Sequence, residues 1–155
     1  MTSGRRRLIL DGRQIGIGLD QLANSFLSRA DITGVQALTL LYILQNAEEG
    51  VSVTSLHLAS GHSKATVSRL VKRLWEKGYI SLEPSPEDGR QRRLRGTEEG
   101  RQLRQFLEQS IARAEEQLYR GFSAAELREL ERLQRKMLEN LYTSPESVQK
   151  EETTK

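Results

Sequence analysis

The residues best suited to chemistry in this 155-residue sequence are basic and hydroxyl side chains between Ser60 and Arg95. This stretch has nine basic and four acidic residues, a net charge of +5, whereas the stretch from Thr97 to Tyr142 has a net charge of −1. Because the whole chain carries only +3, the placement of charge is more informative than its amount. A local positive field suits phosphates, although charge alone also allows a membrane surface or an acidic protein as partner.

The segment from Ser63 to Leu74 divides into two faces at helical spacing. Val67, Val71 and Leu74, together with Leu70, recur at steps that would pack inward. Short hydroxyl side chains at the start of such a helix can approach base edges, and an arginine can reach guanine acceptors or a phosphate. A solvated charged face on a surface helix is the alternative. The candidate DNA-binding residues of this segment are Ser63, Lys64, Thr66, Ser68, Arg69 and Arg73.

A second basic cluster follows, in which four of the six residues from 90 to 95 are arginines. Asp88, two positions before Arg90, can hold the guanidinium in a charge-assisted pair. We expect Arg90 to enter the narrow minor groove of DNA, where negative potential is focused. Charge that protects an edge strand from aggregation is the alternative, but it does not account for the Asp-x-Arg pairing. Asp88, Arg90 and Arg92 therefore join the candidate DNA-binding residues.

The elements around these residues are predicted by periodicity and capping patterns. Apolar steps of three or four residues predict a first helix that ends near Arg29, and the capping-box pair Thr33 and Gln36 opens a second. The run 38–44 is apolar on nearly every side, which predicts the most buried helix. The later elements are a very short strand over 51–53, a brief helix capped by Thr54 and ending at Ser60, a helix capped by Ser63 and running to Lys77, strands over 79–83 and 90–95, a long helix capped by Thr97, and a last helix opened by Ser123 and Glu126.

Two short helices joined by a turn with Gly61, followed by a hairpin, predict a winged helix-turn-helix. The fold class is therefore mainly α with a small β-hairpin wing, plus a helical dimerisation layer. We expect one domain over 1–155. Within it, 33–96 would be the DNA-reading lobe, 12–30 and 97–142 the helical dimerisation region, and 143–155, which is polar and lacks periodicity, a disordered tail.

Composition excludes several other classes of protein. Cysteine is absent, which removes disulfides and thiolate metal sites, and fits a cytoplasmic protein. No apolar run reaches the length of a bilayer span or forms a signal peptide. His57 and His62 have no nearby carboxylates in sequence, so packing or phosphate contact is favoured over metal binding. Since no phosphate loop, HExxH pattern or elbow serine occurs, we expect neither an enzyme nor a cofactor.

In order and spacing, these motifs resemble the MarR family of bacterial transcriptional regulators, over roughly residues 15–142. The sequence departs from the family pattern at Gly96, where an apolar residue is usual, and in the polar turn Ser60-Gly61-His62. The matching segments are Thr33-x-x-Gln36, Ser63 to Ile80 with its ending Leu74-Trp75-Glu76-Lys77-Gly78-Tyr79-Ile80, Pro86-Glu87-Asp88-Gly89-Arg90, Thr97-Glu98-Glu99-Gly100-Arg101 and Phe122-Ser123-x-x-Glu126.

The resemblance implies a homodimer, in which the first, fifth and sixth helices intertwine with those of a second chain, and a pseudo-palindromic operator in double-stranded DNA. It further implies repression as the commoner mode and a small-molecule effector, often an aromatic acid. The sequence supports the dimer independently, because the apolar stripes of 103–118 and 127–141 exceed what one small winged domain could cover. A monomeric bundle is the alternative to the dimer, and a module that binds an acidic protein is the alternative to DNA binding.

Overall fold

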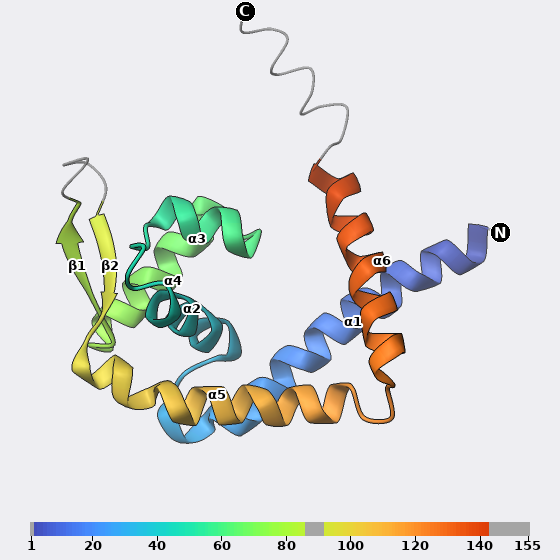
Figure 1. Cartoon of the computed structure of the whole chain (residues 1–155), viewed down its shortest axis with the longest axis horizontal. Helices are drawn as coiled ribbons and strands as arrows, with labels where there is room; N and C mark the ends of the chain where they lie inside the picture. The colour runs from blue at the N-terminus through green and yellow to red at the C-terminus, as the bar shows by residue number, and fades with distance from the viewer. Residues whose placement is uncertain (1, 86–91, 143–155) are drawn as a thin grey trace, which may run out of the picture. The chain divides into compact units, whose positions relative to one another are not determined.

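The computed structural model describes residues 2–85 and 92–142, and Asp88 and Arg90 lie outside them. The described chain is mainly helical with one two-stranded hairpin, which confirms the predicted fold class (Figure 1). In chain order the elements are α1 (Thr2–Leu27), the 3-10 helix η1 (Ser28–Ala30), α2 (Gly34–Gln45), α3 (Val53–Ser60), α4 (Lys64–Glu76), β1 (Ile80–Pro84), β2 (Arg92–Gly96), α5 (Glu98–Leu118) and α6 (Ala124–Tyr142).

The core lies around α2, which contacts α1, α4, α5 and β2. Its inner residues are buried together with the inward stripe of α4, as predicted. The prediction that this run forms the most buried helix is confirmed, since five of the 12 residues of α2 are buried, a larger share than in any other described helix, although Leu38 is 58% exposed. The most deeply buried side chains of the core are Leu27, Leu40, Ile43, Val51, Val67, Leu74, Leu94 and Leu107.

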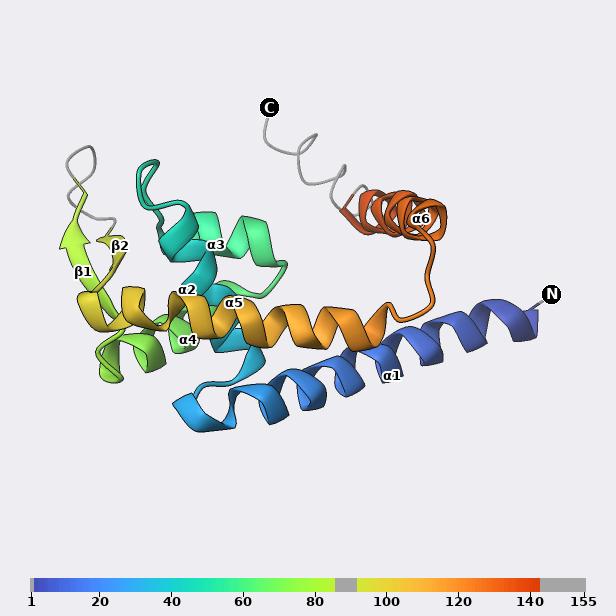
Figure 2. The same ribbon diagram turned by 60° about the horizontal axis from the view of Figure 1, so that its bottom comes forward.

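The first helix is longer than predicted and begins at Thr2. Gly12, Gly16 and Gly18 lie within it with open space around them, so no contact requires glycine there. A glycine in an exposed helix costs only about 1 kcal/mol relative to alanine, which weakens the helix without ending it. The α1 helix packs along α5 within the same unit (Figure 2).

The predicted strand over 51–53 reduces to one β-bridge between Val51 and Leu94, since Val53 already begins α3. The cap of α3 is Ser52 and not Thr54. The Ser52 hydroxyl accepts a hydrogen bond from the Ser55 amide, and the Ser55 side chain accepts one from the Ser52 amide. Several neighbouring hydroxyl residues can serve as a cap, and the buried bridge at Val51 fixes which of them does.

The hairpin is antiparallel, with Ile80 opposite Gly96 and Leu82 opposite Leu94, so both predicted strands are present. The first lies one residue later than predicted, and the second ends one residue later, while its predicted start at 90–91 lies outside the described residues. The chain divides into two compact units, Met1–Leu118 and Tyr119–Lys155. In the second unit, the Ser123 hydroxyl accepts from the Glu126 amide at the start of α6. Among the helices that the structure describes, none combines the length and the hydropathy that a membrane span would need.

Candidate nucleic-acid interface

Three of the predicted site residues form a hydrogen-bonded chain along the first turns of α4. Ser63 caps the helix, because its hydroxyl oxygen accepts from the Thr66 amide at 3.2 Å. The Ser63 hydroxyl donates to Thr66 Oγ1 at 3.0 Å, and Arg69 Nη2 donates to the same oxygen at 3.3 Å. Thr66 Oγ1 therefore lies between the Ser63 hydroxyl and the Arg69 guanidinium. The start of α4 thus presents a positioned guanidinium beside two hydroxyl groups.

The rest of the outer face of α4 is open to solvent and positive. Lys64, Ser68, Arg69 and Arg73 are exposed, whereas Val67, Val71 and Leu74 on the other face are buried. The predicted division of this helix into two faces is therefore confirmed. An exposed row of cations and hydroxyls on a rigid helix matches the side-chain set that contacts phosphates and base edges.

Arg92, the first residue of β2, brings the wing to the same surface. It lines a hollow of about 410 Å³ with Ser68 and Lys72 of α4. Trp75 also lines this hollow and is 53% exposed, an unusual state for a tryptophan in a monomeric domain. Sequence reasoning missed Trp75, although its place outside the inward stripe of α4 was a signal that could have found it.

Arg93, beside Arg92, has a different environment from its neighbour. It is half-buried, and its guanidinium lies over Gly50 in the turn between α2 and α3. Gly50 has φ +82°, a conformation that favours glycine, and a Cβ there would stand 2.6 Å from Arg93 Nε, so a larger residue would also displace this flexible side chain. The two arginines therefore differ in their surroundings: the Arg93 guanidinium packs against the α2–α3 turn, while Arg92 is exposed.

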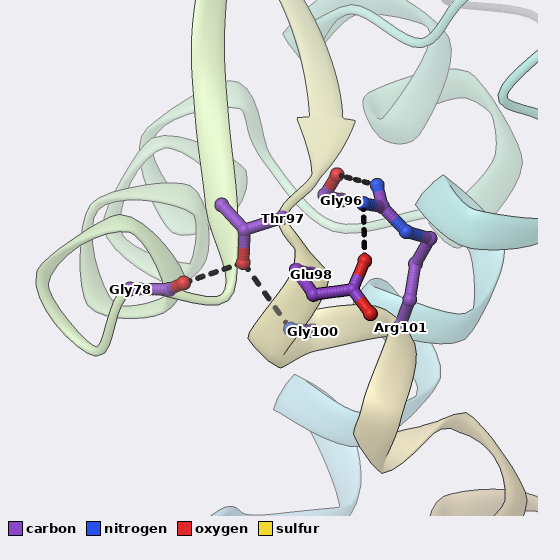
Figure 3. Close-up of polar contacts among 6 residues, drawn as sticks. All are labelled: Gly78, Gly96, Thr97, Glu98, Gly100 and Arg101. Atoms are coloured by element: carbon purple, nitrogen blue, oxygen red, sulfur yellow. Dashed lines mark hydrogen bonds and ion pairs between the residues drawn. The ribbon is translucent and has the colours of Figure 1, made fainter.

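A second joint fixes the base of the wing to α5, as Figure 3 shows. The Thr97 hydroxyl donates to the Gly78 carbonyl at 2.6 Å and accepts from the Gly100 amide at 3.2 Å, which confirms Thr97 as the cap of α5. Arg101 closes the joint by donating to the Gly96 carbonyl at 2.8 Å and pairing with Glu98 at 2.8 Å. The hairpin is thus held at its base by backbone acceptors rather than by exposed charges alone.

Gly96, the departure from the family pattern, serves close packing. A Cβ at this position would overlap Leu44 of α2. Gly100 is the stricter case, since a Cβ there would overlap the Tyr79 carbonyl oxygen, which belongs to the backbone. At Gly96 the absence of a side chain leaves room for the Leu44 side chain of α2.

The polar groups of the turn Ser60-Gly61-His62 find hydrogen-bond partners within the turn and at the end of α3. His57 Nδ1 lies 2.6 Å from the His62 carbonyl oxygen, so Nδ1 carries a proton, and the Ser60 hydroxyl accepts from the His62 amide. Gly61 ends α3 with φ 74°. Over residues 2–85 and 92–142, no group of three His, Asp or Glu side chains could hold a metal ion.

The structure thus brings Ser63, Thr66 and Arg69 into one network, and Ser68 and Arg92 line the same hollow. Lys64 and Arg73 are exposed on the same helix. Because α4 follows α3 across a three-residue turn and is itself followed by the β1–β2 hairpin, the arrangement is a winged helix-turn-helix.

Comparison with known proteins places the chain within this class. Residues 30–91 match the model of the MarR family. The HTH-type transcriptional repressor IacR of Pseudomonas putida is 31% identical over 105 residues, which are 67% of this chain and 62% of the relative. The match therefore spans less than two thirds of that repressor.

Two solved complexes have the same architecture. A mutant MarR from E. coli complexed with operator DNA has a TM-score of 0.73 and 26% identity, over 85% of this chain and 91% of that chain. The S. aureus MepR–DNA complex has a TM-score of 0.77 and 26% identity, over 83% and 92%. Over residues 30–91 the chain thus matches the MarR family, and over 83–85% of its length its fold matches these two DNA complexes.

Proposed function

We propose that this protein is a sequence-specific, DNA-binding transcriptional regulator that acts in the cytoplasm as a repressor. It binds a pseudo-palindromic operator as a homodimer. The observation that carries this proposal is the network of Ser63, Thr66 and Arg69 at the start of α4, because it holds a guanidinium and two hydroxyl groups together on one helical surface. In helix-turn-helix proteins, the start of the second helix meets base edges in the major groove.

The other candidate residues then divide by task. Lys64 and Arg73 supply charge for phosphates, and Ser68 and Arg92 meet the backbone where α4 faces the wing. Asp88 and Arg90 are assigned to the minor groove from the sequence alone. The relatives support the partner, since the matching E. coli and S. aureus structures are complexes with DNA and the P. putida relative is a repressor.

The dimer is supported by apolar surface that the chain leaves open. On α1, Leu8, Ile9 and Leu10 are at least 60% exposed, and on α6, Leu141 is 72% exposed. The stripe of α5 contributes less than the sequence suggested, because Leu107 and Ala114 are buried and the other apolar residues half-buried within this chain. We therefore assign most of the interface to α1 and α6.

A small-molecule effector is part of the proposal. A cavity of about 370 Å³ lies among α1, α2 and α3, lined by Asp20, Leu38, Tyr42, Leu56 and His62 among others. Its size and mixed lining suit a small organic molecule, and it lies between the helical layer and the DNA-reading lobe. A thermal-shift panel of aromatic acids, followed by DNA release assays with those that stabilise the protein, tests this part.

Selection from random duplex DNA tests the main proposal. The purified dimer should enrich a two-fold related sequence, with half-sites about one helical turn apart, near 34 Å. Binding of the selected duplex should weaken steeply with salt and exceed binding of a scrambled duplex by about 10³-fold or more. An acidic partner protein predicts salt-sensitive binding to any polyanion with no enriched sequence, and that outcome would refute the proposal.

A further inference from the structure

Lys77, the residue that caps the C-terminal end of α4, extends away from the outer face of that helix. Its Nζ donates to the Asp31 carbonyl oxygen and, at 3.2 Å, to Gln36 Oε1. These acceptors lie 46 and 41 residues away in sequence, in the turn between η1 and the start of α2. The end of the candidate recognition helix is therefore tied to the connection between α1 and α2.

The turn that accepts Lys77 is itself tightly defined. Gln36 Oε1 also accepts from the Thr33 amide, and the Thr33 hydroxyl accepts from the Gln36 amide, which completes the capping box of α2. Asp31 has φ 49°, the only positive φ at a non-glycine residue within the described chain. Leu27 and Ile32, on either side, are buried. A residue with positive φ such as Asp31 keeps that conformation only where its surroundings hold it in place. The turn that accepts the Lys77 hydrogen bonds is therefore rigid.

The length of α4 means that a small change of tilt at Lys77 displaces the other end of the helix, at Ser63. The helix has 13 residues and is about 20 Å long. A tilt of about 5° at Lys77 would move the Ser63 end by roughly 2 Å, whereas a functional site must be held to within about 0.5 Å. Side chains at Thr66 and Arg69 would lose their register with base edges while keeping their charge.

We propose that Lys77 is a positioning residue for DNA binding, which holds α4 in register with the α1–α2 turn and does not itself contact DNA. The inference rests on the proposed function. Lys77 is half-buried and two of its three ammonium protons are engaged within the protein, whereas Lys72 on the same helix is exposed, with only a 4.0 Å contact to Glu76. The two lysines have equal charge and different tasks.

The test compares Lys77→Met with Lys72→Met on the selected operator duplex across a salt series. Lys77→Met should lower affinity about ten-fold at every salt concentration, with an unchanged slope of log K against log salt. Lys72→Met should reduce that slope by up to about one, because it removes an exposed cation beside Arg73, on the face of α4 that we assign to phosphates. Lys77→Arg, which retains donors, should recover part of the loss, and Gln36→Leu should weaken binding less than Lys77→Met, also without a change of slope.

Hydrogen exchange in the free protein gives a readout that does not depend on DNA. Lys77→Met should speed exchange of the amides that close the last turn of α4 and the start of α2, while those at the Ser63 cap stay protected. If Lys77→Met does not fold, Lys77→Arg and Gln36→Leu carry the same comparison. A reduced salt slope in the Lys77 variants, or binding equal to wild type, overturns the positioning role alone. A wild-type protein that enriches no duplex overturns the proposed function, and this role with it.

Discussion

The outer face of α4 and the apolar face of α6 are both exposed, but they expose opposite chemistry. The first presents Lys64, Arg69 and Arg73, which water solvates well. The second presents large apolar side chains, which water solvates poorly. The apolar face of α6 consists of Leu127, Leu130, Leu133, Met137, Leu138 and Leu141, and all but Leu130 are at least 36% exposed.

The difference shows how one chain separates two kinds of recognition. A charged face can stay open until a polyanion arrives, because its unbound state is stable in water and its binding is governed by counterion release. An apolar face gains free energy from being covered all the time, so it suits a permanent protein partner. Changes on α6 should therefore alter assembly, and changes on α4 should alter DNA binding within an intact assembly.

The largest expected effect is on assembly. The wild-type protein should be a dimer at micromolar concentration by sedimentation equilibrium. Leu133→Glu, which places a charge in the centre of the apolar face, should raise the dimer dissociation constant by about 100-fold or more, because an unpaired charge would have to be desolvated.

Arg128→Gln is the matched control for Leu133→Glu, since it changes the net charge of α6 by the same amount on the polar face. It should leave the dissociation constant within about two-fold of wild type. A monomeric wild type, or equal effects of the two variants, would show that the apolar face of α6 is not an interface.

The second effect concerns base recognition by α4. Arg69→Ala should cost about 1–3 kcal/mol on the selected operator and much less on a scrambled duplex, because a base contact carries sequence information. Fluorescence anisotropy on both duplexes measures this. If both affinities fall equally and the salt slope drops by about one, Arg69 contacts a phosphate instead.

The third effect, a few-fold change in affinity, concerns the wing. Arg90→Lys should weaken operator binding, because lysine keeps the charge but loses the planar fork, whereas Arg92→Lys should change little. Asp88→Ala should also weaken binding, although it removes a negative charge near DNA. Circular dichroism confirms that each variant is folded. If Asp88→Ala binds more tightly and Arg90→Lys binds as wild type does, the wing contacts DNA only as a diffuse positive patch and Asp88 does not orient Arg90.

Local sequence patterns predicted much of this fold. The features that they did not predict depend on contacts between residues far apart in the sequence. Thr33, Ser63 and Thr97 were correctly predicted as caps, because a cap depends on residues three positions away. Whether Ser52 or Thr54 caps α3 depends on a bridge to the wing, which no local pattern contains.

The same limit applied to the candidate site. The inward and outward faces of α4 follow from helical periodicity, so they were predictable. The residues near Lys77 in sequence do not predict its hydrogen-bond acceptors, which lie more than 40 residues away. The residues near Gly50 likewise do not predict its contact with the Arg93 guanidinium. Residues that join distant elements emerge only when the fold brings those elements together.

The smallest effect is expected on the polar face of α6, where Arg132 donates to Glu129 at 2.6 and 2.9 Å. These hydrogen bonds lower the pKa of the Glu129 carboxyl below its ordinary value of 4.5. A lowered folded-state pKa contributes stability above the unfolded pKa, and that stability is lost as pH falls through the folded pKa. Because both side chains are more than half exposed, solvent screens the pair.

Arg132→Gln should therefore raise the Glu129 pKa in a carboxyl NMR titration, yet leave the melting temperature and the dimer dissociation constant at pH 7 within error. A clear loss of dimer in Arg132→Gln, comparable to that of Leu133→Glu, would mean that the polar face of α6 is also buried in the assembly, and the contrast between its two faces would have to be abandoned.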